Sequence, residues 1–326
     1  MSKSISDLQK IYSDALSEYK LPTVTPNLYE PVEYLLGLGG KRIRPVLVLA
    51  GYNMYGEDLK VATGMAHAVE YFHNFSLMHD DIMDEADLRR GKETVHKKYD
   101  INTAILSGDV MLIKAYEFIE QYPAELQVAL FKLFNQTSVK ICEGQQMDID
   151  FETRDNVSIV EYLEMITNKT AVLLGAALQF GGMIGGASSE DGDHLYGFGK
   201  YMGIAFQVQD DLLDVFASTL DSGKVEGGDI LQKKKTYLYL KSLELLGEED
   251  AKRLTFLFSD QDEVQGDALV KEGRALMEDC HVKVYAQELK ENYQQLAFSH
   301  LQSVSVAEIK KEELKTFAQA LLNRSH

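Results

Sequence analysis

The chain has little proline, and what there is lies near its beginning. Its five prolines end at Pro123, so no helix-interrupting proline occurs in the rest of the sequence. Runs that alternate β-branched and polar residues, which are typical of half-buried strands, are also absent. The sequence therefore predicts an all-α fold.

Cysteine is scarce as well. The two cysteines, Cys142 and Cys280, do not form a disulfide framework, and this favours a reducing compartment. The first residues lack the apolar core of a signal peptide, and no apolar run reaches membrane-spanning length. We therefore expect a cytoplasmic protein without membrane insertion.

The sequence has fewer basic than acidic residues. The chain has 33 Lys and Arg against 51 Asp and Glu, a net charge of −18. This argues against nucleic acid or an anionic membrane as a partner, because both require a basic face. An anionic substrate would have to be held by local basic residues or by metal ions. The 326 residues contain no low-complexity linker, so we expect a single domain over residues 1–326.

An acidic triplet follows a long apolar helical pattern in the first third of the chain. Asp80, Asp81 and Asp84 close a helix predicted over residues 57–85. Asp80 and Asp84 are one turn apart and project from the same face. Two carboxylates held so near to each other repel unless a cation lies between them. Oxygen-only ligands suit a hard ion such as Mg²⁺.

The same pattern recurs at Asp210, Asp211 and Asp214, at the end of a helix predicted over residues 190–216. One such triplet could be a solvated helix end, since short motifs often occur by chance. Two triplets that both follow apolar helices are hard to explain as surface decoration. Gln207 lies three residues before the second triplet.

Basic residues gather in a few places. Lys41 and Arg44 follow two glycines and precede a buried helix, a position suited to an anion, although a basic surface turn is the alternative. His73 lies two turns before Asp80, where a core role and a functional role are equally plausible. A charged loop is predicted over residues 86–100.

A lysine and a threonine, Lys169 and Thr170, lie amid apolar and small residues of a helix predicted over 158–186. A buried lysine is costly, so Lys169 needs an anionic partner or access to solvent. Another helix is predicted over 123–143, and it ends in the polar run that begins at Glu143.

In order along the chain, these motifs read GGKRIRP, HNFSLMHDDIMDEADLRRG, GQQMD, KT and QVQDDLLD, and lysines follow. Over about residues 30–240 the chain resembles the trans-isoprenyl diphosphate synthases, or polyprenyl synthetases. The resemblance implies an all-helical, barrel-like bundle of the isoprenoid synthase type around a deep central cavity. It also implies a homodimer and Mg²⁺, with three ions when substrate is bound. The family joins isopentenyl diphosphate to an allylic diphosphate (dimethylallyl, geranyl or farnesyl) by ionisation, condensation and proton loss.

The resemblance assigns roles by position. The residues that it implies as Mg²⁺ ligands are Asp80, Asp84 and Asp210. Asp81, Asp211 and Asp214 would orient waters or ligands. The residues that it implies for binding the allylic diphosphate are Arg89, Lys169, Lys224 and Lys234. The residues that it implies for binding isopentenyl diphosphate are Lys41, Arg44, His73 and Arg90, and no metal takes part there. Thr170 and Gln207 would turn lone pairs toward the carbocation, and the released pyrophosphate would take the proton. The spacing to Thr236 favours Lys234 over Lys233 and Lys235, with a solvated helix start as the alternative.

Product length should depend on what blocks the cavity beneath Asp80. Phe75 lies five residues earlier, about 7.5 Å deeper along a helix. Ser76 is small, and Phe72 lies about a turn further down. An aromatic residue at Phe75, without an insertion in DDIMD, resembles the short-chain geranylgeranyl type. We therefore expect C15–C20 products, leaning to C20.

Three other readings compete. A terpene cyclase also uses an acidic motif with Mg²⁺, but it normally has an Asn/Ser/Glu motif in place of the second triplet and does not need GGKRIRP. A non-catalytic subunit of a heteromeric synthase usually lacks aspartates or basic residues, and none is missing here. A longer-chain quinone-tail synthase would favour small residues at 71–75, where Phe72 and Phe75 stand.

Overall fold

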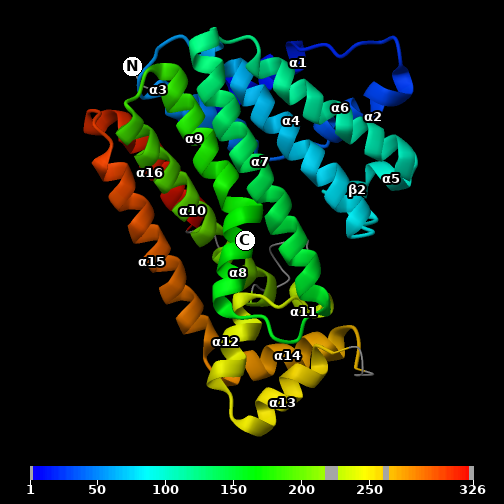
Figure 1. Ribbon diagram of the computed structural model, residues 1–326. Coiled ribbons are helices and arrows are strands. Elements are labelled where there is room, and N and C mark those ends of the chain that lie inside the picture. The colour runs from blue at the N-terminus through cyan, green and yellow to red at the C-terminus, as the bar shows by residue number, and fades with distance from the viewer. Residues whose placement is uncertain (1–2, 217–226, 260–263, 323–326) are drawn as a thin grey trace. The chain divides into compact units, whose positions relative to one another are not determined.

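A computed structural model of the protein describes residues 3–216, 227–259 and 264–322 (Figure 1). One antiparallel pair of two-residue strands, β1 (Leu88–Arg89) and β2 (Lys92–Glu93), occurs in these ranges, and the other regular elements there are helices. The all-α fold class predicted from the sequence is therefore confirmed. No helix within the described ranges combines the length and apolar character needed to cross a membrane.

The chain groups into two compact units. The first comprises residues 1–135, 176–196 and 304–314, and the second comprises residues 136–175, 197–303 and 315–326. Four helices begin in one unit and end in the other: α7 (Ala124–Thr153), α9 (Val172–Gly185), α10 (Ser189–Phe216) and α16 (Glu308–Leu322). The single domain expected over residues 1–326 stays a prediction.

The first unit is organised around α4. Its own helices are α1 (Ile5–Glu18), α2 (Pro26–Gly37), α3 (Ile43–Asn53), α4 (Lys60–Met83), α5 (Val95–Lys98) and α6 (Ile101–Ile119). α4 packs against both α3 and α6 and is buried around most of its circumference (Figure 1). α9 approaches α3 so closely that a Cβ on Gly181 would lie 2.0 Å from the Val48 carbonyl oxygen, which requires glycine there.

The second unit has a separate apolar core. Its own helices are α8 (Ile159–Ile166), the π-helix η1 (Thr167–Ala171), α11 (Gly228–Leu231), α12 (Tyr237–Leu245), α13 (Glu248–Leu257), α14 (Asp267–Asp279) and α15 (Val282–Ser303). α12, α13 and α14 pack against one another (Figure 1). Tyr162 of α8 and Leu212 of α10 belong to this core, so the second acidic triplet is placed on a helix fixed by packing.

Three local predictions differ from the structure. The helix predicted over 123–143 continues to Thr153, because Met147 and Phe151 repeat the four-residue spacing and pack on the core of the second unit. The helix predicted over 158–186 is interrupted by the five-residue π-helix η1. The charged loop over 86–100 contains the hairpin β1–β2 and the short helix α5.

Candidate active site

The first acidic triplet lies at the end of α4, and its three carboxylates have different surroundings. Asp81 is 2% exposed and accepts three hydrogen bonds from Arg89, at 2.9 and 2.8 Å from Nε and 2.7 Å from Nη2. Arg89 comes from β1, so the hairpin brings it back onto the helix end. Asp80 is half-buried, and Asp84 is exposed. The buried carboxylate is therefore engaged by an arginine, and the outer two are more exposed.

The second triplet, on α10, repeats this division. Asp211 is 4% exposed and accepts hydrogen bonds from the Tyr162 hydroxyl and, at 3.1 Å, from the Gln207 amide. Burial, together with the charge of Asp229, raises the pKa of Asp211 to about 8. Asp210 and Asp214 are half-buried, and Asp214 also accepts a 2.8 Å hydrogen bond from the backbone of Asp229. In both triplets the middle carboxylate is tied to protein groups and the outer two are more exposed.

The predicted lysine–threonine pair lies in η1, and π-helical turns are frequent at functional sites. Lys169 Nζ is 2.5 Å from Asp148 Oδ2, so Asp148 is the anionic partner that a half-buried lysine requires. Thr170 Oγ1 lies 3.5 Å from Gln207 Oε1. A chain of side-chain contacts thus joins Thr170, Gln207, Asp211 and Tyr162 within the second unit.

Arginines gather around a neutral histidine in the first unit. Arg44 Nη1 is 3.1 Å from His73 Nε2, and burial with the nearby arginine charges holds the pKa of His73 well below its usual 6.5. The unprotonated Nε2 therefore accepts the hydrogen bond. Burial lowers the pKa of Arg44 to about 10, and its Nε has no partner among the described residues.

Two further arginines complete this cluster, which we call the arginine cluster (Arg42, Arg44 and Arg90 around His73). Arg42 forms an ion pair with the buried Glu70. Arg90 donates to the Gly39 carbonyl, and a Cβ on Gly40 would lie 2.7 Å from its guanidinium. The structure therefore brings together three of the four residues predicted for isopentenyl diphosphate, while Lys41 is exposed on the neighbouring loop. Arg42 was missed by the sequence reasoning, although it lies inside GGKRIRP.

The lysines after the second triplet are in distinct environments. Lys233 donates to the Ser259 carbonyl, and Lys235 donates to the carbonyls of Phe151, at 2.8 Å, and Arg154. Lys234 is exposed, and its ammonium has no hydrogen bond or ion pair within the described ranges. This favours Lys234 as the lysine available to a diphosphate. Lys224 lies outside the described residues.

The predicted chain-length residues lie in an aromatic group on α4. Phe72 is buried, and its ring centroid is 5.7 Å from that of Phe75 and 5.3 Å from that of Phe134. Phe75 is half-buried and lies 4.8 Å from the His79 ring. Ser76 donates to the His73 carbonyl at 2.9 Å.

The carboxylates of the two acidic triplets are the donors available to magnesium. Within the described ranges, no three His, Cys, Asp or Glu side chains are grouped to hold a metal ion. Each triplet instead offers two outer carboxylates. Mg²⁺ is commonly held by one or two carboxylates, with waters and substrate phosphates completing its shell. The residues therefore fit an ion that is bound jointly with a diphosphate.

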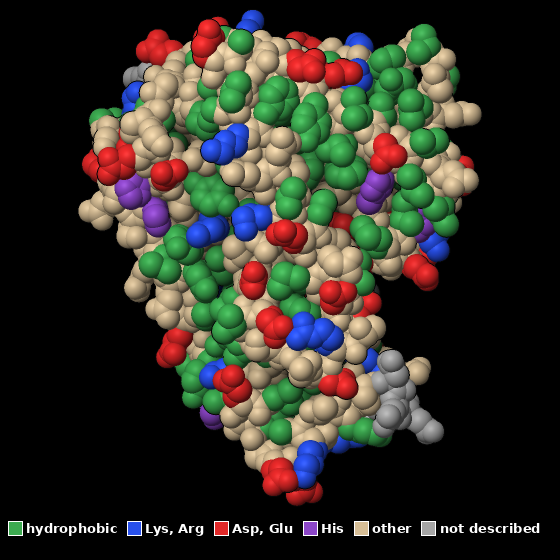
Figure 2. Space-filling view, viewed as in Figure 1, with side chains coloured by type: hydrophobic (Ala, Val, Ile, Leu, Met, Phe, Trp, Pro, Cys, Tyr) green, Lys and Arg blue, Asp and Glu red, His purple; other side chains and the backbone are tan. Residues whose placement is uncertain are grey.

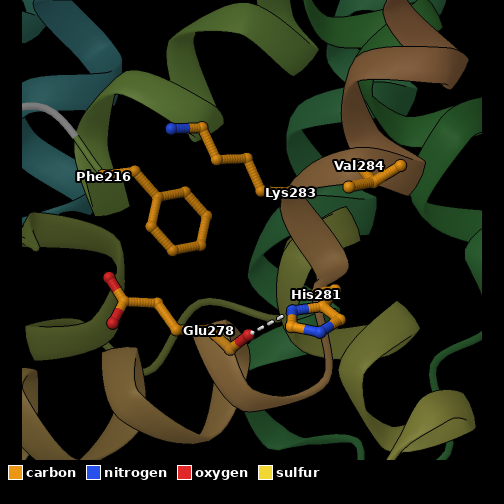
Figure 3. Close-up of a pocket in the computed structure, with 5 residues that line it drawn as sticks. All are labelled: Phe216, Glu278, His281, Lys283 and Val284. Atoms are coloured by element: carbon orange, nitrogen blue, oxygen red, sulfur yellow. Dashed lines mark hydrogen bonds between the residues drawn. The ribbon is translucent and has the colours of Figure 1, made fainter.

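A cavity of about 280 Å³ lies elsewhere in the second unit (Figure 3). It is lined by Phe216, Glu278, His281, Lys283 and Val284, and none of these carries a predicted role. His281 Nδ1 donates to the Glu278 carbonyl at 3.1 Å, which accounts for the orientation of its ring. The cavity therefore adds no residue to the acidic triplet of either unit or to the arginine cluster of the first unit.

Comparison with known proteins agrees with this chemistry. The family model for polyprenyl synthetase matches residues 25–273. The chain is 36% identical to a short chain isoprenyl diphosphate synthase of Methanothermobacter thermautotrophicus, covering 99% of both chains. It is 36% identical to a geranylgeranyl pyrophosphate synthase of Geoglobus acetivorans, covering 100% of both. A crystal structure of a geranylgeranyl pyrophosphate synthase has 44% identity and a TM-score of 0.93, covering 99% of both chains.

The chain belongs to the polyprenyl synthetase family, and the resemblance noted in the sequence is confirmed. The protein is accordingly a prenyltransferase, as predicted. Two residues that the sequence did not single out also lie beside the site. Tyr162 holds Asp211, and the buried Lys290 donates to Gln209 at 2.7 Å, next to Asp210 in the chain. Neither belongs to a recognisable motif, so only their contacts reveal them.

Proposed function

We propose that the protein condenses isopentenyl diphosphate with an allylic diphosphate, head to tail, to give a short-chain prenyl diphosphate, leaning to geranylgeranyl diphosphate. The arginine cluster carries this proposal. It is a site for a polyanion that contains no carboxylate pair for a metal, so it suits a second diphosphate substrate. A terpene cyclase has one diphosphate to bind and does not need it.

The two diphosphates are proposed to bind in different ways. Arg44, Arg90 and His73, with Lys41 and Arg42, hold isopentenyl diphosphate through charge-assisted hydrogen bonds. His73 stays neutral there and fixes the Arg44 guanidinium. The unpaired Nε of Arg44 is a donor that such a ligand can satisfy.

Allylic binding is proposed to use Lys169, Lys234, Lys224 and Arg89 together with Mg²⁺, on which the family generally depends. Asp80, Asp84, Asp210 and Asp214 would hold the metal, and three ions are proposed with substrate bound. When bound, the ions neutralise the charge that builds on the departing diphosphate. Asp81 and Asp211 act through their hydrogen bonds, because Arg89, Tyr162 and Gln207 already engage them.

The reaction then needs little further chemistry from the chain. The allylic C–O bond breaks, the double bond of isopentenyl diphosphate supplies the electron pair of the new C–C bond, and a proton leaves. Thr170 and Gln207 present oxygen lone pairs to the transient positive charge. The proton is proposed to leave with the released pyrophosphate. Apolar walls keep water from the cation.

A homodimer is also proposed. α6 exposes Ile101, Ile105, Leu106 and Ile113 by 40–59%, and Val128 at the start of α7 is 73% exposed. Hydrophobic side chains gather over α6 and the start of α7 in Figure 2. A stripe of large apolar residues on a chain with this much net charge is explained if a second copy covers it. We further propose a cytoplasmic location.

The test is a product analysis. Purified protein is incubated with Mg²⁺, labelled isopentenyl diphosphate and each of the C5, C10 and C15 allylic primers. The molecular masses of the products are then measured. We expect label in diphosphates of C15–C20, with C20 dominant. Cyclised hydrocarbons without consumption of isopentenyl diphosphate would instead identify a cyclase.

A further inference from the structure

A lysine interrupts the apolar face of α15. The buried side chains of this helix recur at helical spacing and are Val282, Ala286, Lys290, Ala297 and Leu301. Lys290 is only 5% exposed, its Nζ donates to Gln209 Oε1 of α10 at 2.7 Å, and burial lowers its pKa. Burying an ammonium beside a neutral amide is unfavourable, because most of the hydration of the charge is lost. The lysine therefore calls for an explanation other than stability.

Gln209 lies on the side of α10 opposite to another set of polar contacts. Gln207 Oε1 is 3.5 Å from Thr170 Oγ1 of η1. One turn later, Asp211 accepts a hydrogen bond from the Tyr162 hydroxyl of α8. Gln209 stands midway between Gln207 and Asp211 in the chain, so it is about 200° around the helix from each of them. Polar contacts therefore hold α10 from two opposite sides, by α8 and η1 on one side and by α15 on the other.

The two outer carboxylates of the second triplet lie between these contacts. Around the helix, Asp210 is about 100° beyond Gln209, and Asp214 is about 40° further round. Both carboxylates therefore occupy the arc between the Gln209 contact and those of Gln207 and Asp211. Apolar attraction is non-directional, whereas hydrogen bonds weaken steeply when they are misaligned. A hydrogen bond on each side therefore restrains rotation of α10, and with it the direction of Asp210 and Asp214.

We propose that Lys290 is a positioning residue, which holds Gln209 so that Asp210 and Asp214 keep the direction that metal binding requires. The inference deepens the proposed function and rests on it. Lys290 does not touch the substrate, and its effect passes through Gln209 and the rotation of α10. Its charge strengthens the contact, because charge-assisted hydrogen bonds are about twice as strong as neutral ones. This gain explains an ammonium at a position where an apolar residue would be more stable.

The test separates positioning from stability with two variants. K290M removes the donor and leaves Gln209 Oε1 without it, so we expect the Tm to fall by about 2–4 °C. Q209L/K290M replaces both partners by apolar groups and should return the Tm to the wild-type value or above it. In both variants kcat should fall about 10- to 100-fold, because the outer aspartates are misaligned. KM for isopentenyl diphosphate should not change, because the arginine cluster lies in the first unit.

Lys311 of α16 provides a matched control. It is another buried lysine, 4% exposed, and it donates to Glu308 at 2.9 Å. Lys311 has no role in the candidate site. K311M should therefore leave kcat and the KM values of both substrates as in wild type, whatever its effect on the Tm.

A further readout does not depend on turnover. Inorganic pyrophosphate with Mg²⁺ should raise the Tm of K290M and of Q209L/K290M less than that of wild type or K311M. Recovery of both Tm and kcat in Q209L/K290M would overturn the proposal, since the contact would then serve stability alone. A K290M variant with wild-type kcat and pyrophosphate shift would overturn it too. If wild type binds pyrophosphate but does not consume isopentenyl diphosphate, the proposed function fails while the pyrophosphate shift still tests Lys290.

Discussion

Replacing Tyr162 by Phe isolates one contact behind the second acidic triplet. The Tyr162 side chain is buried, and its hydroxyl donates to Asp211, which is itself 4% exposed. The substitution keeps the ring and removes only the donor, so a buried carboxylate loses one of the two side-chain hydrogen bonds found for it. Because the acceptor is buried and water cannot easily replace the donor, we expect a loss of about 1–3 kcal/mol in the free energy of unfolding.

The chain provides a matched control in Tyr12. Its side chain is also fully buried, but its hydroxyl has no hydrogen-bond partner among the described residues. Tyr12→Phe therefore removes an unsatisfied polar group, and we expect no loss of stability or a gain of up to about 1 kcal/mol. The two variants delete the same atom from the same residue type, so a general effect of losing a tyrosine hydroxyl cancels.

Urea unfolding followed by circular dichroism measures both changes, and steady-state kinetics give a second readout. Tyr162→Phe should also lower kcat, because Asp211 is adjacent to Asp210, while KM for isopentenyl diphosphate stays the same. Equal destabilisation by the two variants would refute the reasoning, since it would show that the hydrogen bond to Asp211 contributes nothing specific.

Three further predictions concern other regions. Burial lowers the pKa of His67 to about 4, so the unfolded chain binds this proton at a higher pH than the folded protein does. The free energy of unfolding should therefore fall by about 3 kcal/mol as the pH falls from about 6.5 to about 4. Unfolding of His67→Phe measured across this pH range should lack that loss; an unchanged profile would exclude His67 as its source. Phe75→Ala should lengthen the labelled product beyond C20 by mass, and an unaltered product distribution would remove Phe75 as the block. Leu106→Glu with Ile113→Glu should halve the mass measured by light scattering, whereas a wild-type mass would place the dimer contact elsewhere.

The parts of the site that depend on local spacing were accessible from the sequence. Asp80 and Asp84 are one turn apart, and a helix of that apolar pattern fixes their common face whatever packs around it. The all-α class followed in the same way from the absence of strand patterning. The assignment of Lys234 also rested on spacing, and the contacts of Lys233 and Lys235 now support it.

Other features depend on contacts between residues far apart in the chain. Arg42 and Glu70 are 28 residues apart, and Tyr162 and Asp211 are 49 residues apart, so no sequence window contains either pair. The π-helical turn at Lys169 and the ion pair of Lys169 with Asp148 likewise arise where α7 and η1 meet. The sequence by itself determined which carboxylates and basic residues are present and which share a helix face, because helical geometry is local. Only the tertiary structure decided which of them are already paired and which remain available to a substrate, because burial and partnership depend on the packing of distant segments.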